Sequence, residues 1–167
     1  MVPVAVAAPP SREPRTFASP AEVLRSLAGI AYRAGPLAAT YMGGRLDPEL
    51  RERVMVAVSR VNACRGCTFV HERWALRSGV TLEDLEAIGL GDLGPLDRRG
   101  RAAVVYATAR AEAGFREPAP ADVAAAAAEH LTARELAAVE AVARAMALAN
   151  LSVSTVEALA ARLRGGD

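Results

Sequence analysis

Residues 47–79, DPELRERVMVAVSRVNACRGCTFVHERWALRSG, contain two helical patterns joined by a short turn. Asp47-Pro48 places a capping residue before a proline at the first helical position, which is typical of a helix start. The aliphatic residues that follow lie on one stripe of period 3.6, and they are Leu50, Val54, Ala57, Val58 and Val61. This helix should end near Asn62, and a second should run from about Cys64 to Gly79, with Asn62 or Ala63 as its cap. The stretch therefore predicts an antiparallel helical hairpin.

Helical patterns continue on both sides of this hairpin. Ser19-Pro20-Ala21-Glu22 predicts a helix that runs to Gly35-Pro36, and a poorly defined segment follows through residues 41–44. Downstream, helices are predicted from Thr81–Asp84 onward, from Leu96 to Gly114 after a glycine-rich loop at 90–95, over the alanines of 121–129, from Thr132 to about Asn150, and from there to about Arg164.

Length and composition agree with one all-α domain. The chain has 167 residues and a net charge of +1, within the range of roughly 100–200 residues for a single domain. Its 52% apolar content is dominated by alanine, with only three Phe, three Tyr and one Trp, which argues against a β-sandwich or barrel. Residues 1–18, with three prolines between Pro9 and Pro14, are predicted to be a flexible arm, and residues 19–167 a single compact helical domain.

Several function classes are disfavoured. Every basic residue is arginine, so lysine Schiff-base chemistry is excluded, and the even charge balance offers no cationic footprint for nucleic acid. No run approaches the ~18 uninterrupted apolar residues of a membrane span, and the apolar start lacks the basic residues of a signal peptide. We therefore expect a cytoplasmic protein with reduced thiols, and neither nucleic acid nor a membrane as a partner.

The chemistry-bearing residues are concentrated at the turn of the hairpin. Cys64, Cys67 and His71 are spaced by three and four, so one helical face presents both sulfurs and the imidazole in succession. Cysteines in the first turn of a helix lie near the positive end of its dipole, which stabilises a thiolate. Glu52 lies about ten residues before the turn and His71 about eight after it, so they should meet at similar depth, ~15 Å and ~12 Å from it. The resulting hypothesis is a relay from Glu52 through His71 to Cys67, with Cys64 as the second sulfur.

At these residues the sequence resembles the alkylhydroperoxidase D (AhpD-like) branch of the carboxymuconolactone decarboxylase superfamily. The resemblance rests on a Glu twelve positions before a Cys-x-x-Cys and a His four positions after it, followed by the helix break at Ser78-Gly79. It extends more weakly over roughly residues 45–160. It implies an all-helical fold, assembly as trimers or hexamers, and a cofactor-free thiol peroxidase or disulfide reductase.

The resemblance also implies residue roles. Glu52 and His71, acting through water, would activate Cys67, peroxide would oxidise it to a sulfenic acid, and Cys64 would condense with it to a disulfide. A dithiol, thioredoxin-like or lipoyl-type partner would then reduce that disulfide. Gly66 stands where well-studied members carry an extra histidine, and decarboxylase members lack the cysteine pair.

Other interpretations of the same residues remain open. Cys64 and Cys67 could form half of a zinc site with His71 and Glu52, although no second cysteine pair exists. The protein could be a thiol-disulfide reductase without peroxidase activity, or a non-enzymatic redox sensor or structural protein. Spacing does not settle which cysteine meets substrate first. Trp74, on the same helical face, is predicted to pack in the core or at a subunit interface. The alanine-rich long helix predicts association into a homo-oligomer.

Overall fold

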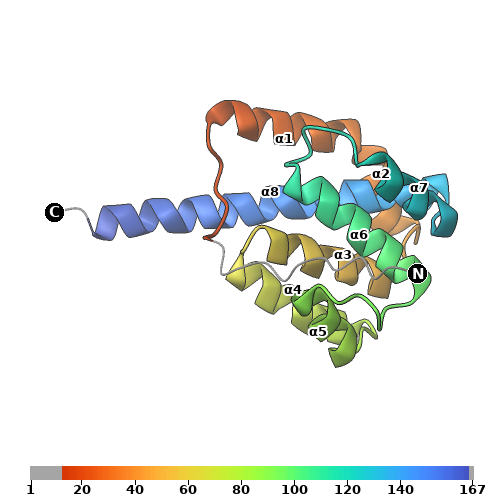
Figure 1. The fold of residues 1–167 in the computed structure, drawn as a ribbon. Coiled ribbons are helices and arrows are strands. Elements are labelled where there is room, and N and C mark those ends of the chain that lie inside the picture. Colours follow the sequence, from red (N-terminus) through yellow and green to blue (C-terminus); the bar gives the residue numbers. More distant parts are fainter. Residues whose placement is uncertain (1–12, 166–167) are drawn as a thin grey trace.

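The computed structural model describes residues 13–165 as a bundle of eight α-helices, with no strand in that part of the chain. The all-α prediction is confirmed. Figure 1 shows the helices gathered around α8, which is by far the longest. In chain order the helices are α1 (Pro20–Tyr32), α2 (Ala34–Met42), α3 (Pro48–Val61), α4 (Arg65–Arg77), α5 (Leu82–Leu90), α6 (Arg98–Glu112), α7 (Ala121–His130) and α8 (Ala133–Arg164).

The main core lies between α3, α6 and α8. Its side chains are mostly alanine and valine, with a few leucines and methionines, so the helices approach one another closely. A second, smaller cluster lies between α3, the end of α4, α5 and the start of α6. Because α3 contributes to both clusters, it is buried on nearly all sides.

The C-terminal part of the chain differs from its prediction. Two helices were predicted on either side of Asn150, but α8 is continuous. Asn150 is fully buried, and its amide donates to the Ser59 hydroxyl at 3.3 Å and accepts from the Asn62 amide at 3.2 Å. The Ser152 hydroxyl donates to the Leu148 carbonyl one turn earlier, at 2.8 Å. The prediction was wrong because these polar side chains find partners without interrupting the helix.

The boundary of the first two helices also differs. The first helix ends at Tyr32 rather than at Gly35-Pro36, and α2 covers most of the segment that was predicted to be poorly defined. Pro36 is the third residue of α2. Proline is accepted in the first turn of a helix because backbone N–H groups there have no partner within the helix.

The predicted helix starts at Asp47-Pro48 and at Thr132 are confirmed, and they are tied to one another. Asp47 accepts a hydrogen bond from the backbone N–H of Leu50 at 2.8 Å, which caps α3. Thr132 and Glu135 form the predicted capping box at the start of α8. Arg99 of α6 donates to the carboxylates of both Asp47 and Glu135, each at 2.6 Å. One guanidinium thus joins the starts of three helices.

A buried cluster of charges joins α6 to α8. The Glu140 carboxylate accepts hydrogen bonds from Arg110 at 2.9 and 3.0 Å and from Arg144 at 2.7 Å. Burial opposes ionisation of Glu140, but the hydrogen bonds and charges of the two arginines outweigh it and lower the pKa of this carboxyl. The ionised cluster is therefore a structural part of the core.

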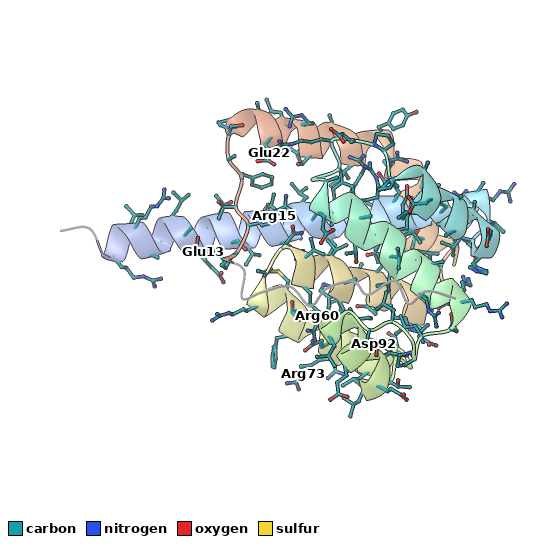
Figure 2. All side chains as sticks on the ribbon, in the orientation of Figure 1. Glu13, Arg15, Glu22, Arg60, Arg73 and Asp92 are labelled. Carbon is teal, nitrogen blue, oxygen red and sulfur yellow. A yellow bond between two sulfur atoms is a disulfide. The ribbon has the colours of Figure 1, made fainter. Side chains whose placement is uncertain are left out.

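Part of the predicted N-terminal arm lies within the described residues. Residues 13–19 have no regular secondary structure, and they pass close to α8, where the Phe17 N–H donates to the Thr155 hydroxyl at 3.0 Å. Figure 2 places Arg15 between this segment and the bundle. The remainder of the predicted arm, residues 1–12, lies outside the described residues, as do the last two residues of the predicted domain.

By length and composition alone, α8 could cross a membrane. The sequence contains no run of apolar residues without interruption that is of sufficient length. In α8 the apolar residues are interrupted by Glu140 and Arg144. Half of the residues in the apolar window of α8 are buried inside the fold, and core helices of soluble proteins satisfy the same criteria.

Candidate active site

The turn between α3 and α4 places the two cysteines. Ala63 adopts a positive φ of 54°, an uncommon conformation for a residue with a Cβ, and it reverses the chain within two residues. Cys64 is the N-cap residue of α4, and its backbone N–H donates to the Ser59 carbonyl at 3.1 Å. Neither Asn62 nor Ala63 caps α4, which corrects the prediction. Asn62 instead ends α3 and turns its amide toward α8.

Cys64 and Cys67 are joined by a disulfide, with their Cα atoms 5.3 Å apart. The expectation of reduced thiols therefore does not describe this form of the protein, which is the oxidised one. The two sulfurs differ in environment. Cys64 is 2% exposed, whereas Cys67 is only partly buried and borders the main core. Of the two cysteines, Cys67 is the more exposed residue.

Glu52 and His71 meet across the hairpin, as their matched depth predicts. The His71 Nδ1 atom lies 2.9 Å from Glu52 Oε2, and the two side chains are 13% and 3% exposed. An ionised Glu52 can only accept a hydrogen bond, so the proton of a neutral His71 lies on Nδ1. The other ring nitrogen, Nε2, is then free to accept a proton. A buried carboxylate that orients an imidazole in this way is the arrangement of a general base.

Arg51 supports the same carboxylate from its other side. Its Nε lies 3.4 Å from Glu52 Oε1, and its guanidinium lies 5.0 Å from the centre of the Tyr41 ring. Burial raises the pKa of Tyr41, Arg51 lowers it and Glu52 raises it, with a net increase. Sequence reasoning missed Arg51, because adjacent helical residues usually point in different directions. No motif marks it, and only the position of α2 reveals it.

Trp74 covers the outer side of the relay. Its ring meets the His71 ring edge-on, with centroids 5.4 Å apart. Trp74 was predicted to pack in the core or at a subunit interface. The core alternative is wrong, because 51% of its surface is exposed, and the interface alternative stays a prediction. Phe69 and Val70, one turn away, are also exposed, and Ala75 is the single buried residue that α4 contributes. The helix that carries Cys67 therefore exposes large apolar side chains as well as arginines.

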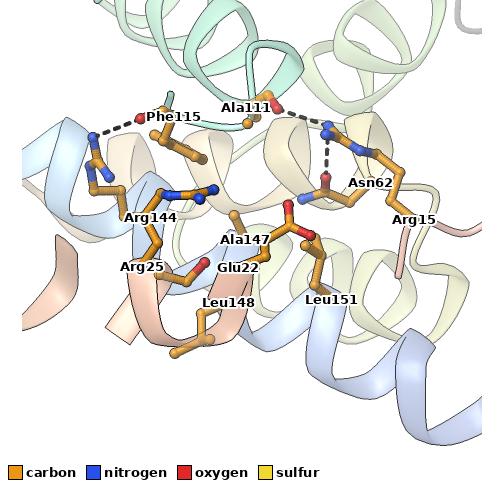
Figure 3. A pocket seen from close by; sticks show the side chains of 12 residues that line it. Arg15, Glu22, Arg25, Asn62, Ala111, Phe115, Arg144, Ala147, Leu148 and Leu151 are labelled. Carbon is orange, nitrogen blue, oxygen red and sulfur yellow. Dashed lines mark hydrogen bonds between the residues drawn. The ribbon is translucent and has the colours of Figure 1, made fainter. Parts of the chain in front are cut away.

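A polar network supports the turn from below. Asn62 bonds to Asn150, and its backbone carbonyl accepts from the Arg15 N–H at 3.0 Å. The Arg15 guanidinium also reaches the Asn62 side chain at 3.4 Å and the Ala111 carbonyl at 2.8 Å, as Figure 3 shows. These contacts connect the N-terminal segment, α6 and α8 to the residues just before Cys64. The unusual polarity of Asn150 in an apolar helix is the one sequence signal for this network.

The four predicted site residues lie on two adjacent helices, with Glu52 on α3, Cys64 at the start of α4, and Cys67 and His71 within α4. In residues 13–165, no group of three or more histidine, cysteine, aspartate and glutamate side chains is placed to hold a metal ion. Because the disulfide lies on the same helix as an imidazole that a buried carboxylate orients, the arrangement can perform disulfide chemistry.

Comparison with known protein families gives a match, which covers this part of the chain. The model of the carboxymuconolactone decarboxylase family matches residues 28–92, which include α2 to α5 and all four candidate residues. No curated protein matches the chain. The segment that carries the disulfide and the Glu52–His71 pair is thus a domain of the carboxymuconolactone decarboxylase family.

Proposed function

We propose that this protein is a cofactor-free thiol peroxidase of the alkylhydroperoxidase D type, which reduces hydroperoxides through Cys64 and Cys67. One observation carries the proposal. A bonded Cys-x-x-Cys pair lies at the N-terminus of α4, one turn before a histidine that a buried glutamate orients. A carboxymuconolactone decarboxylase family domain provides the setting. The cysteine pair distinguishes this chain from the decarboxylase pattern.

Cys67 is the proposed attacking residue and Cys64 the resolving one. Cys67 is the more accessible sulfur and lies four residues before His71 on the same helix, so it can transfer its proton to the imidazole, directly or through water. Cys64 is buried at the N-cap position of α4, where the helix dipole favours its thiolate as a leaving group.

The proposed cycle starts from the dithiol. The Cys67 thiolate attacks the terminal oxygen of the hydroperoxide, the O–O bond breaks, and the alkoxide leaves as an alcohol after taking the proton held by His71. Cys67 is then a sulfenic acid. The Cys64 thiol attacks its sulfur, the S–S bond forms, and the hydroxyl group leaves as water. An external dithiol returns the disulfide to two thiols and becomes a disulfide itself.

The reducing partner is proposed to be a thioredoxin-like or lipoyl-type dithiol. Such partners operate in reducing compartments, so we propose a cytoplasmic protein that uses neither a membrane nor nucleic acid. We also propose that it works as a homo-oligomer, a trimer or a hexamer by resemblance.

A thiol-disulfide reductase without peroxidase activity is the second candidate. Its support is the exposure of Phe69 and Trp74 on the helix that carries the partly buried Cys67, because exposed large apolar side chains suit the docking of a protein partner near the disulfide. In that case the reduced Cys64 and Cys67 pair reduces a disulfide of a partner protein and becomes a disulfide itself. Peroxide is not consumed.

Peroxide consumption with a dithiol as electron donor tests the proposal. Cys67→Ser and Cys64→Ser should each abolish turnover. Glu52→Gln should slow it at least about tenfold, since general-base assistance contributes ~10²–10⁴-fold. Glu49→Gln is the matched control, because Glu49 lies one turn away on α3 and is 39% exposed. Dithiol oxidation by a protein disulfide without peroxide consumption would favour the second candidate.

Alkylation of the reduced protein identifies the attacking sulfur. Iodoacetamide rates for each cysteine, measured by mass spectrometry from acid to alkaline pH, should show that Cys67 reacts faster and already at pH values below ~8.5. Normal titration of both thiols, with unchanged kinetics in Glu52→Gln, would remove the relay from the mechanism.

A further inference from the structure

The last turns of α8 extend beyond the other helices. Figure 1 shows the C-terminal third of this helix projecting from the bundle, and its buried side chains end at Ser154. Most helical stability in proteins comes from packing against other elements. A helical segment shorter than about 12–15 residues, such as this projecting end, is only marginally stable in water without such packing. The projecting part is therefore expected to have a packing partner.

An apolar stripe follows this projecting part on the side away from the bundle. Val153, Val156, Leu159 and Leu163 are 40%, 65%, 51% and 87% exposed. Together with Ala160, residues 153, 156, 160 and 163 are spaced by three, four and three, which is the spacing of a two-helix seam. At 100° per residue, this stripe lies opposite the buried Leu151 and Ser154. Within residues 13–165, it belongs to neither of the two core clusters.

The charges beside the stripe indicate what covers it. Glu157 and Arg164 are exposed and lie seven residues apart, so both occupy the same flank of the seam. In an antiparallel pair of identical helices, the same flank of each helix faces its counterpart. A crossing centred near Ala160 then places Glu157 opposite Arg164 of the second copy, and the reciprocal pair forms by symmetry. A parallel pair would bring no such opposite charges together.

We propose that the projecting part of α8, residues 153–164, is a docking surface for a second copy of this chain in antiparallel orientation. The small Ala160 side chain at the centre permits close approach of the two helices, and the aliphatic side chains on either side of it fill the seam. The contact is self-complementary, so it closes as a two-fold dimer. The proposed contact joins two copies of the chain, and it does not depend on the proposed chemistry at Cys64 and Cys67.

Sedimentation velocity of the full chain, from about 1 to 100 μM, tests this surface, since a seam of this length belongs to the small interface class. The wild type should form dimers, or hexamers in which this contact pairs the trimers that the resemblance implies. Glu157→Arg and Arg164→Glu should each raise the dissociation constant of the pairing about tenfold or more, because each places two like-charge pairs in the dimer. The double variant should recover most of the wild-type affinity.

Arg162→Glu is the matched control. It makes the same change of charge two residues away, on a side of the helix turned about 160° from Arg164, and it should leave association unchanged. Helix content from circular dichroism confirms that every variant folds. A wild-type monomer at the highest concentration overturns the proposal. So does a double variant without recovery, a control that weakens association as much as Arg164→Glu, or an assembly that none of these variants affects.

Discussion

The two helices of the site hairpin have opposite relations to the rest of the molecule. Ten of the fourteen residues of α3 are buried, against one of the thirteen residues of α4. Glu52 belongs to the buried helix, whereas Cys67 and His71 belong to the exposed one. The difference indicates a division of roles, in which α3 holds the carboxylate still and α4 presents the sulfur to solvent.

The largest effect of a substitution is expected in the buried charge cluster between α6 and α8. Glu140→Gln removes the charge that Arg110 and Arg144 share, leaving buried cations without a full partner, and should cost about 3–5 kcal/mol of unfolding free energy at neutral pH. Urea unfolding, followed by circular dichroism, measures this loss. A cost below about 1 kcal/mol would contradict a structural role for the cluster.

The same residue predicts a pH dependence. The pKa of Glu140 is lower in the folded protein than in the unfolded chain, because the arginine hydrogen bonds outweigh burial. The contribution of ionised Glu140 to the unfolding free energy is therefore fully present above the ordinary carboxyl pKa. It is lost as the pH falls through the lower pKa that Glu140 has in the folded protein. The wild type should lose unfolding free energy in acid more steeply than Glu140→Gln, and parallel pH profiles would contradict this assignment.

A pair of identical substitutions compares the two hairpin helices directly. Leu50→Ala on α3 empties a core position that is 1% exposed and should cost about 2–5 kcal/mol. Leu76→Ala on α4 affects a side chain that is 43% exposed and should change stability by about 0.5 kcal/mol or less. Similar urea midpoints for the two variants would remove the distinction between a buried and an exposed helix.

The polar network below the turn should have an intermediate effect. Asn150→Ala leaves Asn62 without its side-chain acceptor in the interior and should cost about 1–3 kcal/mol. It should also loosen the turn before Cys64, so hydrogen exchange at the Cys64 N–H should accelerate. Ser152→Ala, an exposed position on the same helix, is the control. Equal exchange rates in the two variants would show that the polar network does not stabilise the turn.

The smallest effect is expected at the edge of the site. Arg51→Met removes the cation that opposes the raised pKa of Tyr41, so that pKa should rise further. Ultraviolet titration of the tyrosines measures the shift. Arg73→Met is the control, since Arg73 stacks on Phe69 of the exposed helix and should leave the tyrosine titration unchanged. A lower tyrosine pKa in Arg51→Met would contradict this geometry.

Local patterns predicted much of this architecture. The Asp47 cap, the capping box at Thr132 and the hairpin around Cys64 all depend on interactions within a few residues, which a sequence displays directly. The approach of Glu52 to His71 was also predictable, because a short turn fixes the register of the two helices it joins. Asn150 was missed because its partners Ser59 and Asn62 lie far away in the sequence, and Arg51 because its contact with Tyr41 depends on how α2 packs against α3.

The sequence by itself determined the helical class, the helix starts and the spacing that brings one carboxylate, one imidazole and two sulfurs into reach, since these follow from helical periodicity and capping. Tertiary structure decided that α8 continues through Asn150, that Cys64 is buried while Cys67 is accessible, and that Trp74 lies outside the core. The physical reason is that burial depends on which distant helices cover a residue, and helix continuity at a polar residue depends on partners those helices supply.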